Sequence, residues 1–216
     1  MKKIKIGVLV SGRGSNLQAV IDNIGNGSLT AEVAVVISDQ ADAYALERAR
    51  THNIPAVHIS ARDYKGKREE YDGLLVQELR KHGVDLVILA GFMRIITGTL
   101  VKAFPNRIMN IHPALLPSFP GLHVQKAAID HGVKFSGCTV HFVDEGMDTG
   151  PIIIQAIVPV LDNDTEDTLA ARILKQEHRI FSRAIQLFAE GKLTVEGRIV
   201  KVAGGRTESD DHLFNP

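Results

Sequence analysis

The chain has 216 residues, and its 25 lysines and arginines are balanced by 25 aspartates and glutamates. Hydrophobic residues make up 44% of it, which is ordinary for a globular protein with a sizeable core. A net charge of zero provides no global basic field for holding nucleic acid. No apolar run approaches the roughly 18 residues of a membrane span, and the single Cys138 excludes an intramolecular disulfide. We therefore expect a cytoplasmic protein with neither nucleic-acid nor membrane partners.

Strands and helices alternate along the chain. Runs of β-branched and other apolar residues predict strands over 3–10, 31–39, 54–60, 84–92, 107–113, 136–144 and 151–160. Apolar residues at helical spacing predict helices over 15–25, 42–53, 64–83, 97–103, 123–132 and 164–192. A small hairpin is predicted around Glu196 and Gly197, followed by a polar tail.

This alternation is typical of βαβ units. It predicts a three-layer α/β fold with a mostly parallel, twisted sheet of about seven strands, helices on both faces and a Rossmann-like N-terminal half. The later strands are left open as antiparallel or mixed. We expect a single domain over 1–200 and a tail over 201–216. Such folds bind ligands at the carboxyl ends of their strands, and each motif below is judged by that position.

The first predicted strand ends in a glycine-rich turn, SGRGSN, that opens the next helix. Free backbone N–H groups and the positive end of a helix dipole favour an anion there. Gly12 and Gly14 begin a dinucleotide fingerprint, but Leu17 holds the third glycine position, which disfavours a pyrophosphate. A single phosphate monoester held by Gly14, Ser15 and Asn16 fits better. The structural alternative is a plain helix cap by Ser15.

Asn110 and His112 stand at the end of the fifth predicted strand, in the stretch NIHPALLPSFPG. Alternation along a strand puts both side chains on one side, so they can act on one atom together. Asparagine donates a neutral hydrogen bond to a developing oxyanion, and histidine exchanges protons near pH 7. The prolines stiffen the following loop, and Leu116–Pro117 is a candidate cis peptide. The alternative is a structural histidine before a turn.

Three carboxylates, those of Asp144, Glu145 and Asp148, lie in the loop DEGMDTG between two predicted strands. For Asp144 and Glu145 an acidic turn is at least as good an interpretation as a binding role. Calcium is disfavoured, because the spacing lacks the loop pattern with a terminal glutamate. Asp148 beside His112 would make an acid–base pair, in which the carboxylate orients the imidazole and favours its charged form.

Glu177 interrupts the apolar stripe of the last helix, four residues after Ile173 and four before Phe181. It therefore faces inward, where a carboxylate is unfavourable unless it is paired. A basic side chain and a ligand amine are equally good partners for it. The nine histidines are scattered and there is no cysteine pair, so we expect no metal site. No Gly-x-Ser-x-Gly elbow is present, which disfavours a serine hydrolase.

Five stretches resemble the folate-dependent formyltransferases, in the same order and over about residues 3–200. They are GSN (14–16), LAGFMRI (89–95), NIHPALLPSFPG (110–121), HFVDEGMDTGPII (141–153) and QEH (176–178). The Asn-x-His-Pro element with the later aspartate is specific to that class. The single-domain length and the phosphate loop select, within the class, the family that formylates glycinamide ribonucleotide.

The resemblance implies transfer of the formyl group of 10-formyltetrahydrofolate to the amine of glycinamide ribonucleotide, in de novo purine synthesis. Both are small molecules, the folate is a co-substrate, no tightly bound cofactor is expected, and a homodimer is possible. The implied catalytic residues are Asn110, His112 and Asp148. The implied ribonucleotide contacts are Gly14, Ser15, Asn16 and Glu177, and the implied folate contacts are Arg68, Met93, Arg94, Ile95, Ile96 and Asp144. Ala114 departs from the serine that family patterns often place there.

Three other functions are weighed against this one. A formyltransferase acting on an aminoacyl-tRNA is expected to add a basic nucleic-acid-binding part, for which the chain has neither length nor charge. A formyltetrahydrofolate hydrolase is similar in its catalytic half, but it is expected to have a longer chain with an added N-terminal domain, whereas here the first strand is predicted from residue 3. A non-catalytic nucleotide sensor explains the glycine loop but leaves Asn110, His112 and Asp148 without a purpose.

Overall fold

The computed structural model describes residues 3–205. They group into two compact units: the chain up to Asn110 with Val143–Glu145, and Ile111–Phe142 with the chain from Gly146 onward. The single domain expected over 1–200 stays a prediction, and most of the expected tail, 206–216, lies outside the described residues. Within residues 3–205, no helix has the length and apolar character needed to cross a membrane.

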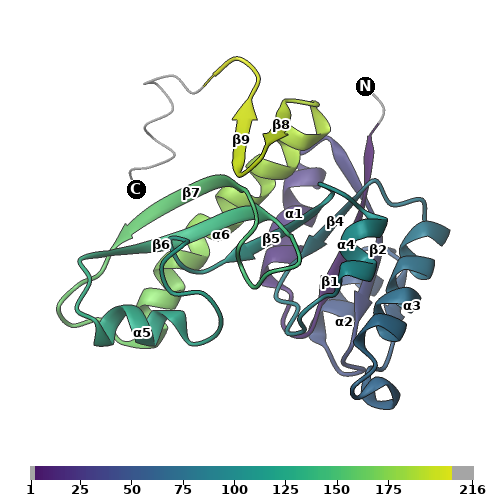
Figure 1. Cartoon of the computed structure of the whole chain (residues 1–216), viewed down its shortest axis with the longest axis horizontal. Helices are drawn as coiled ribbons and strands as arrows, with labels where there is room; N and C mark the ends of the chain where they lie inside the picture. Colours follow the sequence, from purple (N-terminus) through teal and green to yellow (C-terminus); the bar gives the residue numbers. More distant parts are fainter. Residues whose placement is uncertain (1–2, 206–216) are drawn as a thin grey trace. The chain divides into compact units, whose positions relative to one another are not determined.

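The first unit is built on parallel strands in the order β3-β2-β1-β4-β5 (Figure 1). These strands are β1 Ile4–Val10, β2 Ala31–Ser38, β3 Ala56–His58, β4 Leu86–Leu89 and β5 Ile108–His112. The order reverses between β1 and β4, as in other doubly wound sheets. Ligands of open α/β sheets bind at such a switch point, and the predicted Rossmann-like N-terminal half is confirmed.

Helices cover the faces of this parallel sheet. They are α1 Ser15–Gly25, α2 Tyr44–Thr51, α3 Arg68–Lys81 and α4 Gly98–Ala103, with a 3₁₀ turn η1 at Arg62–Tyr64. Leu75 and Leu79 of α3 and Leu100 of α4 join one buried cluster with Leu9 of β1 and Ile37 of β2. The helices α1 and α2 contact each other and β2. Coverage by helices explains why the strands are apolar along their whole length.

The second unit contains a mixed sheet in the order β6-β7-β9-β8. β6 Phe135–Phe142 and β7 Ile152–Pro159 pair antiparallel, and β9 Ile199–Val202 runs parallel beside β7. β8 Leu193–Glu196 completes the hairpin with β9. The long helix α6, Glu166–Ala189, packs on β6 and β7, and α5, Val124–Asp130, packs on α6. The expectation of antiparallel or mixed later strands is confirmed.

The start of α6 is defined by side chains. Thr165 and Thr168 form a reciprocal capping box, which satisfies N–H groups that a helix end leaves open. Asp164, just before them, accepts hydrogen bonds from the two terminal guanidinium nitrogens of Arg172, at 2.7 and 2.8 Å. These hydrogen bonds from Arg172 hold the pKa of the Asp164 carboxyl well below its usual range. The capping box therefore fixes the residue at which α6 begins, and with it the face of the helix on which Glu177 lies.

Two details differ from the sequence prediction. The described residues contain nine strands and not about seven, because both strands of the predicted hairpin join the sheet through β9. The helix predicted over 64–83 begins only at Arg68, since Gly66 adopts a left-handed φ of 81° and separates it from η1. That break exposes residues of 62–66 as part of a cleft described below.

Candidate active site

β5 carries the two polar residues that the sequence predicts to be catalytic. Asn110 and His112 lie two residues apart in this strand, so strand alternation puts them on the same side. His112 is only 4% exposed, and Ile111 between the two polar residues is apolar and buried as well. A histidine that is this deeply buried needs partners for both ring nitrogens.

Both nitrogens of His112 have such partners. Nε2 lies 2.8 Å from the carbonyl oxygen of Phe119, and since a carbonyl only accepts, Nε2 carries a proton and donates. Nδ1 lies 3.5 Å from the carboxylate oxygen Oδ2 of Asp148. The carboxylate thus lies beside the second ring nitrogen, where it can orient the imidazole. The predicted pairing of His112 with Asp148 is present.

Asp148 is held in a backbone conformation that few residue types adopt. Its φ is +54°, in the left-handed region that aspartate tolerates better than most residues. The N–H of Gly121 donates to its Oδ2 at 3.0 Å, and Nε2 of the buried His141 lies 3.8 Å from its Oδ1. The ring of His141 is itself fixed, because its Nδ1 donates to the carbonyl of Phe142 at 2.8 Å. The carboxylate thus lies between two imidazoles.

The proline-rich loop after β5 is tied to the second unit's sheet by two side chains. The hydroxyl of Thr139, fully buried in β6, donates to the carbonyl of Ala114 at 2.7 Å and accepts the N–H of Leu116 at 3.1 Å. Gln155 of β7 donates to the carbonyl of Leu116 at 2.9 Å. The Leu116–Pro117 peptide is cis, as the sequence suggested. These contacts fix the loop whose Phe119 carbonyl holds His112.

The predicted phosphate loop has the geometry of an anion site in the first unit. α1 begins at Ser15 and its N-cap is Gly14, with φ +70° and no side-chain capping bond, so the alternative of a plain cap by Ser15 is wrong. A Cβ on Gly14 would lie 2.7 Å from the Cβ of Ala45 in α2. Glycine is required here both by its φ and by the closeness of α2.

The carbonyls of this loop are all directed back into the protein. Those of Gly12 and Arg13 accept from α2, from the N–H of Ala45 at 3.1 Å and Nε of Arg48 at 2.9 Å. That of Gly14 accepts from within α1 at 3.0 Å. The N–H of a trans peptide points opposite to its C=O. The N–H groups that follow the Gly12 and Arg13 carbonyls therefore point away from α2, and the one that follows the Gly14 carbonyl points away from the body of α1, where an anion can bind.

The residues predicted to bind folate lie mainly in the segment 91–97 after β4. Met93 and Ile95 are 66% and 50% exposed, whereas Ile96 is buried. The guanidinium of Arg94 stacks 4.8 Å above the ring of Tyr71 in α3, which fixes a flexible cation by a cation–π contact. Two large apolar side chains held at the surface beside a fixed cation suit a flat ligand with an anionic end.

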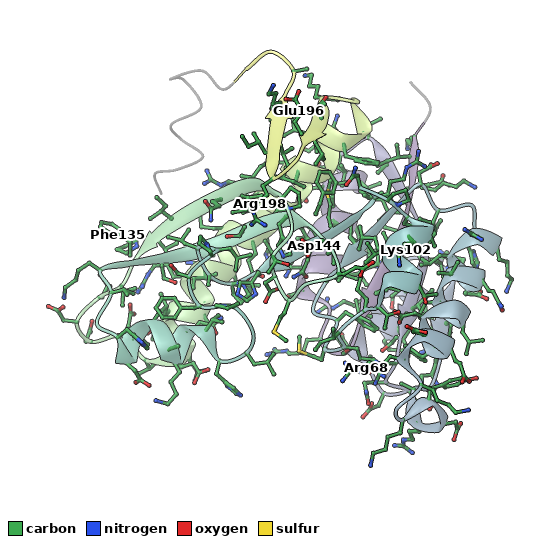
Figure 2. The ribbon with its side chains drawn as sticks, in the orientation of Figure 1. Arg68, Lys102, Phe135, Asp144, Glu196 and Arg198 are labelled. Carbon is green, nitrogen blue, oxygen red and sulfur yellow. The ribbon has the colours of Figure 1, made fainter. Side chains whose placement is uncertain are left out.

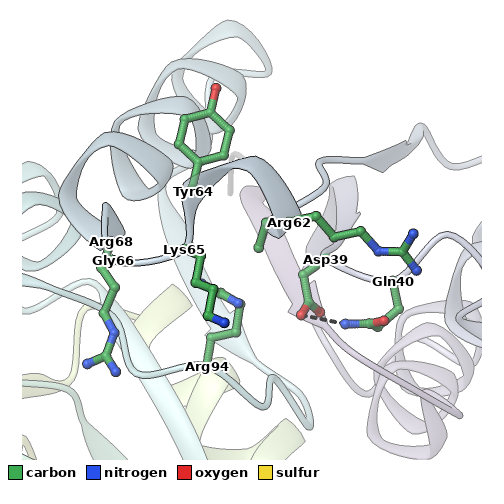
Figure 3. Close-up of a pocket in the computed structure, with 9 residues that line it drawn as sticks. Asp39, Gln40, Arg62, Tyr64, Lys65, Gly66, Arg68 and Arg94 are labelled. Carbon is green, nitrogen blue, oxygen red and sulfur yellow. Dashed lines mark hydrogen bonds between the residues drawn. The ribbon is translucent and has the colours of Figure 1, made fainter.

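A cleft of about 450 Å³ opens next to this segment (Figure 3). Its charged lining residues are Asp39, Arg62, Lys65, Arg68 and Arg94. Four cations face a single carboxylate, and that carboxylate is engaged by Gln40 at 2.8 Å, the dashed contact in Figure 3. The cleft is therefore suited to a carboxylate-bearing ligand. Arg68, at the beginning of α3, is labelled in Figure 2.

Asp144 and Glu177 are not among the residues that line that cleft. Asp144 directly follows Val143 in the first unit, and its neighbour Glu145 pairs with Lys102 of α4 at 3.3 Å. Asp144 and Lys102 are labelled in Figure 2. Glu177 is 8% exposed on the inner face of α6, as the helical pattern predicts. Burial raises the pKa of the Cys138 thiol in β6, and the negative charge of Glu177 adds to that effect. The Glu177 carboxylate therefore lies close to β6.

The chain belongs to the formyl transferase family, whose model matches residues 4–185. Phosphoribosylglycinamide formyltransferase of Escherichia coli (strain K12) is 43% identical over 203 residues, which cover 94% of this chain and 95% of that protein. The crystal structure of glycinamide ribonucleotide transformylase 1 from Symbiobacterium toebii superposes with a TM-score of 0.91 at 56% identity, covering 93% of this chain and 94% of that chain.

A longer relative is also similar to this chain. The trifunctional purine biosynthetic protein adenosine-3 of Drosophila melanogaster is 46% identical over 200 residues. The match covers 92% of this chain but only 15% of that protein. The chain therefore corresponds to one part of the trifunctional relative and to nearly the whole of the bacterial one.

Several residues of the site were missed by the sequence prediction. Thr139 and His141 lie two residues apart in β6, and both face the loops around His112. In the sequence, however, each looks like an ordinary residue of a buried strand. Gln155 is likewise a lone polar residue in the apolar run of β7. The signal that was available is the polar residue inside an apolar strand, since a buried polar group requires a partner. Its partner lies in a distant loop, which the sequence does not reveal.

Replacing Thr139 by valine keeps the side-chain shape but removes its hydroxyl. The buried N–H of Leu116 and the carbonyl of Ala114 lose their partner, so we expect unfolding free energy to fall by about 2 kcal/mol. The conservative Thr139→Ser retains the hydroxyl and is expected to stay close to wild type. Urea denaturation of the three proteins measures this, and equal stability of Thr139→Val and wild type would contradict the role of the hydroxyl.

Proposed function

We propose that this protein transfers the formyl group of 10-formyltetrahydrofolate to the amine of glycinamide ribonucleotide, giving formylglycinamide ribonucleotide and tetrahydrofolate. The observation that carries the proposal is the pair of the buried His112, at the end of β5, with the partly buried Asp148, in a chain of the formyl transferase family. Its relatives of nearly equal length carry the name of that activity. A chain that carries an acid–base pair, a phosphate-type loop and a cation-lined cleft suits two anionic substrates.

The chemistry begins when the substrate amine attacks the formyl carbon. The carbonyl oxygen becomes a tetrahedral oxyanion, which hydrogen-bond donors must stabilise. In our proposal Asn110 donates its amide N–H, and His112 donates the Nε2–H that the carbonyl of Phe119 accepts in this structure. Turning that proton from a neutral carbonyl to a developing oxyanion makes the bond stronger in the transition state than before it.

Asp148 has two roles in the proposed reaction. Its carboxylate beside Nδ1 orients the imidazole so that Nε2 can donate to the oxyanion. The amine loses a proton as it becomes an amide, and the departing folate nitrogen gains one. Asp148 moves this proton through a water molecule, so atoms and charges balance without a covalent enzyme intermediate. Placing both substrates together supplies much of the rate, on the order of 7–11 kcal/mol in well-oriented cases.

We propose that the ribonucleotide phosphate binds the N–H groups at the start of α1, around Gly14, Ser15 and Asn16. The support is the orientation of the loop carbonyls toward α2 and α1. Glu177, on the inner face of α6, is proposed as a further contact of the ribonucleotide because the stretch QEH (176–178) resembles the family at a position that contacts this substrate. The reading of the loop as a pyrophosphate cradle stays the second choice.

The proposed folate site is the segment Met93–Ile96 with the adjoining cleft. The exposed side chains of Met93 and Ile95 offer apolar surface for the flat pterin ring. Arg68 and Arg94 line the cleft, where they suit the carboxylates at the other end of the folate. Asp144 is proposed as a further folate contact. The folate is a co-substrate in this scheme and leaves after each turnover.

We propose that the reaction takes place in the cytoplasm. The single Cys138 is buried as a free thiol, which suits a reducing compartment. A homodimer remains an expectation from the family, which analytical ultracentrifugation would decide. A nucleotide sensor is the alternative of another class, and it is disfavoured because it gives no purpose to the buried acid–base pair.

The first test mixes purified protein with 10-formyltetrahydrofolate, with and without glycinamide ribonucleotide, and follows tetrahydrofolate by absorbance. We expect tetrahydrofolate to form only when the ribonucleotide is present, because the amine is the nucleophile. Formation without any acceptor would instead indicate a hydrolase. No formation in either mixture would overturn the proposed reaction, and folate-binding calorimetry would then separate a different amine acceptor from a sensor.

Replacing His112 by alanine should lower kcat by about a hundred- to ten-thousand-fold, since it removes a general acid and an oxyanion donor. Folate binding should persist, because the proposed folate residues lie elsewhere. His52→Ala is the matched control, as His52 is an exposed residue at the end of α2. Steady-state kinetics measure the first effect and calorimetry the second. A variant of His112 with unchanged kcat would remove this residue from the mechanism.

Replacing Gly14 by alanine should raise KM for the ribonucleotide by about ten-fold, because an alanine at φ +70° is strained and its Cβ meets Ala45. KM for the folate should change little. Gly12→Ala is the matched control, since nothing lies within 4 Å of a Cβ built there. Equal effects of the two substitutions, or a selective effect on the folate, would argue against the phosphate loop.

A further inference from the structure

We propose that Ser11, oriented by Asp39, is a positioning residue for folate: it fixes the backbone at Met93, in the middle of the segment 91–97. The inference rests on the proposed function, because it takes this segment to be the folate site. Ser11 directly follows β1, and Asp39 directly follows β2. Both residues lie at the carboxyl ends of neighbouring strands, on the edge where the ligand is expected.

The serine hydroxyl makes two hydrogen bonds whose directions are fixed by chemistry. Ser11 Oγ lies 2.7 Å from Oδ1 of Asp39 and 2.9 Å from the backbone nitrogen of Met93. A carboxylate only accepts, so the single hydroxyl proton must point to Asp39. The lone pairs of Oγ are then left for the N–H of Met93. The charge of Asp39 thus decides which way the hydroxyl points and makes it a good acceptor.

Asp39 is itself well fixed. It is only 9% exposed, and its second carboxylate oxygen accepts Nε2 of Gln40 at 2.8 Å. A carboxylate this buried is unfavourable unless hydrogen bonds satisfy it, and Ser11 and Gln40 provide them. The position of the serine hydroxyl is consequently set by the side chain of Asp39, which Gln40 holds in place, and not by solvent.

The two ends of the segment 91–97 are held by other contacts. At its beginning the N–H of Ser11 donates to the carbonyl of Gly91 at 3.0 Å. At its end the buried Asp72 accepts both the N–H and the hydroxyl of Thr97, at 2.6 and 2.8 Å. Burial raises the pKa of the Asp72 carboxyl, and these two hydrogen bonds from Thr97 oppose the rise. Neither contact reaches Met93.

The middle of the segment therefore depends on the hydroxyl of Ser11. Phe92 packs against the core and Arg94 stacks on Tyr71, but the side chain of Met93 between them is largely exposed and does not hold its own backbone. The N–H of Met93 is held by the hydroxyl of Ser11. Without the hydroxyl, the N–H of Met93 turns to solvent and the backbone samples other positions. The ordering must then be supplied when folate binds, which weakens its affinity. The ribonucleotide loop keeps its own contacts to α2.

The experiment compares Ser11→Ala, Ser11→Thr and the control Ser28→Ala, an exposed serine of the same unit. We expect the Kd for tetrahydrofolate, measured by calorimetry, to rise about five- to ten-fold in Ser11→Ala, which is the loss of one modest hydrogen bond. Ser11→Thr retains a hydroxyl and should restore most of the affinity. The Kd for glycinamide ribonucleotide should be unchanged in all three proteins.

A second pair of variants tests the role of Asp39. Because Asp39 also lines the cleft, these variants are compared by the backbone at Met93 and not by folate affinity. Asp39→Asn keeps an oxygen that accepts from Ser11, so amide exchange at Met93 should stay near the wild-type rate, whereas Asp39→Ala removes the acceptor. Amide hydrogen exchange should be faster at Met93 in Ser11→Ala and Asp39→Ala, whereas a merely destabilising substitution would speed exchange throughout the unit.

Two results would overturn the inference. One is an unchanged Kd for tetrahydrofolate in Ser11→Ala, and the other is an equal loss of folate and ribonucleotide binding. Failure of the proposed function is distinguishable from both, because it would show in the wild type as absence of folate binding or of turnover. A wild type that transfers formyl groups, beside a Ser11→Ala variant with unchanged Kd, would leave the function intact and remove only the role of Ser11.

Discussion

The second unit is organised around one imidazole that has a partner for each of its two ring nitrogens. His112 donates from one nitrogen to a backbone carbonyl, and its other nitrogen faces a carboxylate. The carbonyl belongs to a loop held by Thr139 and Gln155, and the carboxylate is oriented by Gly121 and a left-handed backbone at Asp148. The strands β6 and β7 thus have a purpose beyond the core, since each supplies a polar side chain that fixes the surroundings of the histidine.

In the first unit, main-chain hydrogen bonds hold the proposed binding loops in place. Its parallel strands end at one edge, where the turn after β1 presents N–H groups and the segment after β4 presents apolar side chains. Leu9 accepts the N–H of Ala90, and Ser11 donates to Gly91, so the exits of these two strands are joined directly. The reversal of strand order between β1 and β4 lies at this point. The two proposed substrate loops therefore share one support.

Much of this architecture follows from local pattern. Apolar runs and helical spacing located the strands and helices, and they placed Glu177 on an inner face. The sequence also paired His112 with Asp148 through chemical complementarity. It missed contacts made by ordinary residues far apart in the chain, such as Ser11 with Asp39 or Thr139 with Leu116. Nothing local distinguishes such a serine or threonine from its neighbours, because its role depends on the register and packing of whole strands.

The one thiol of the chain also has a consequence for its chemistry. Cys138 is fully buried in β6, and burial raises the pKa of its thiol. The thiolate is the form that attacks peroxides and disulfides, so this sulfur is shielded both sterically and by protonation. Since the chain contains no other cysteine, it presents no accessible thiol to oxidants. Inactivation of the folded protein through oxidation of its thiol is therefore not expected.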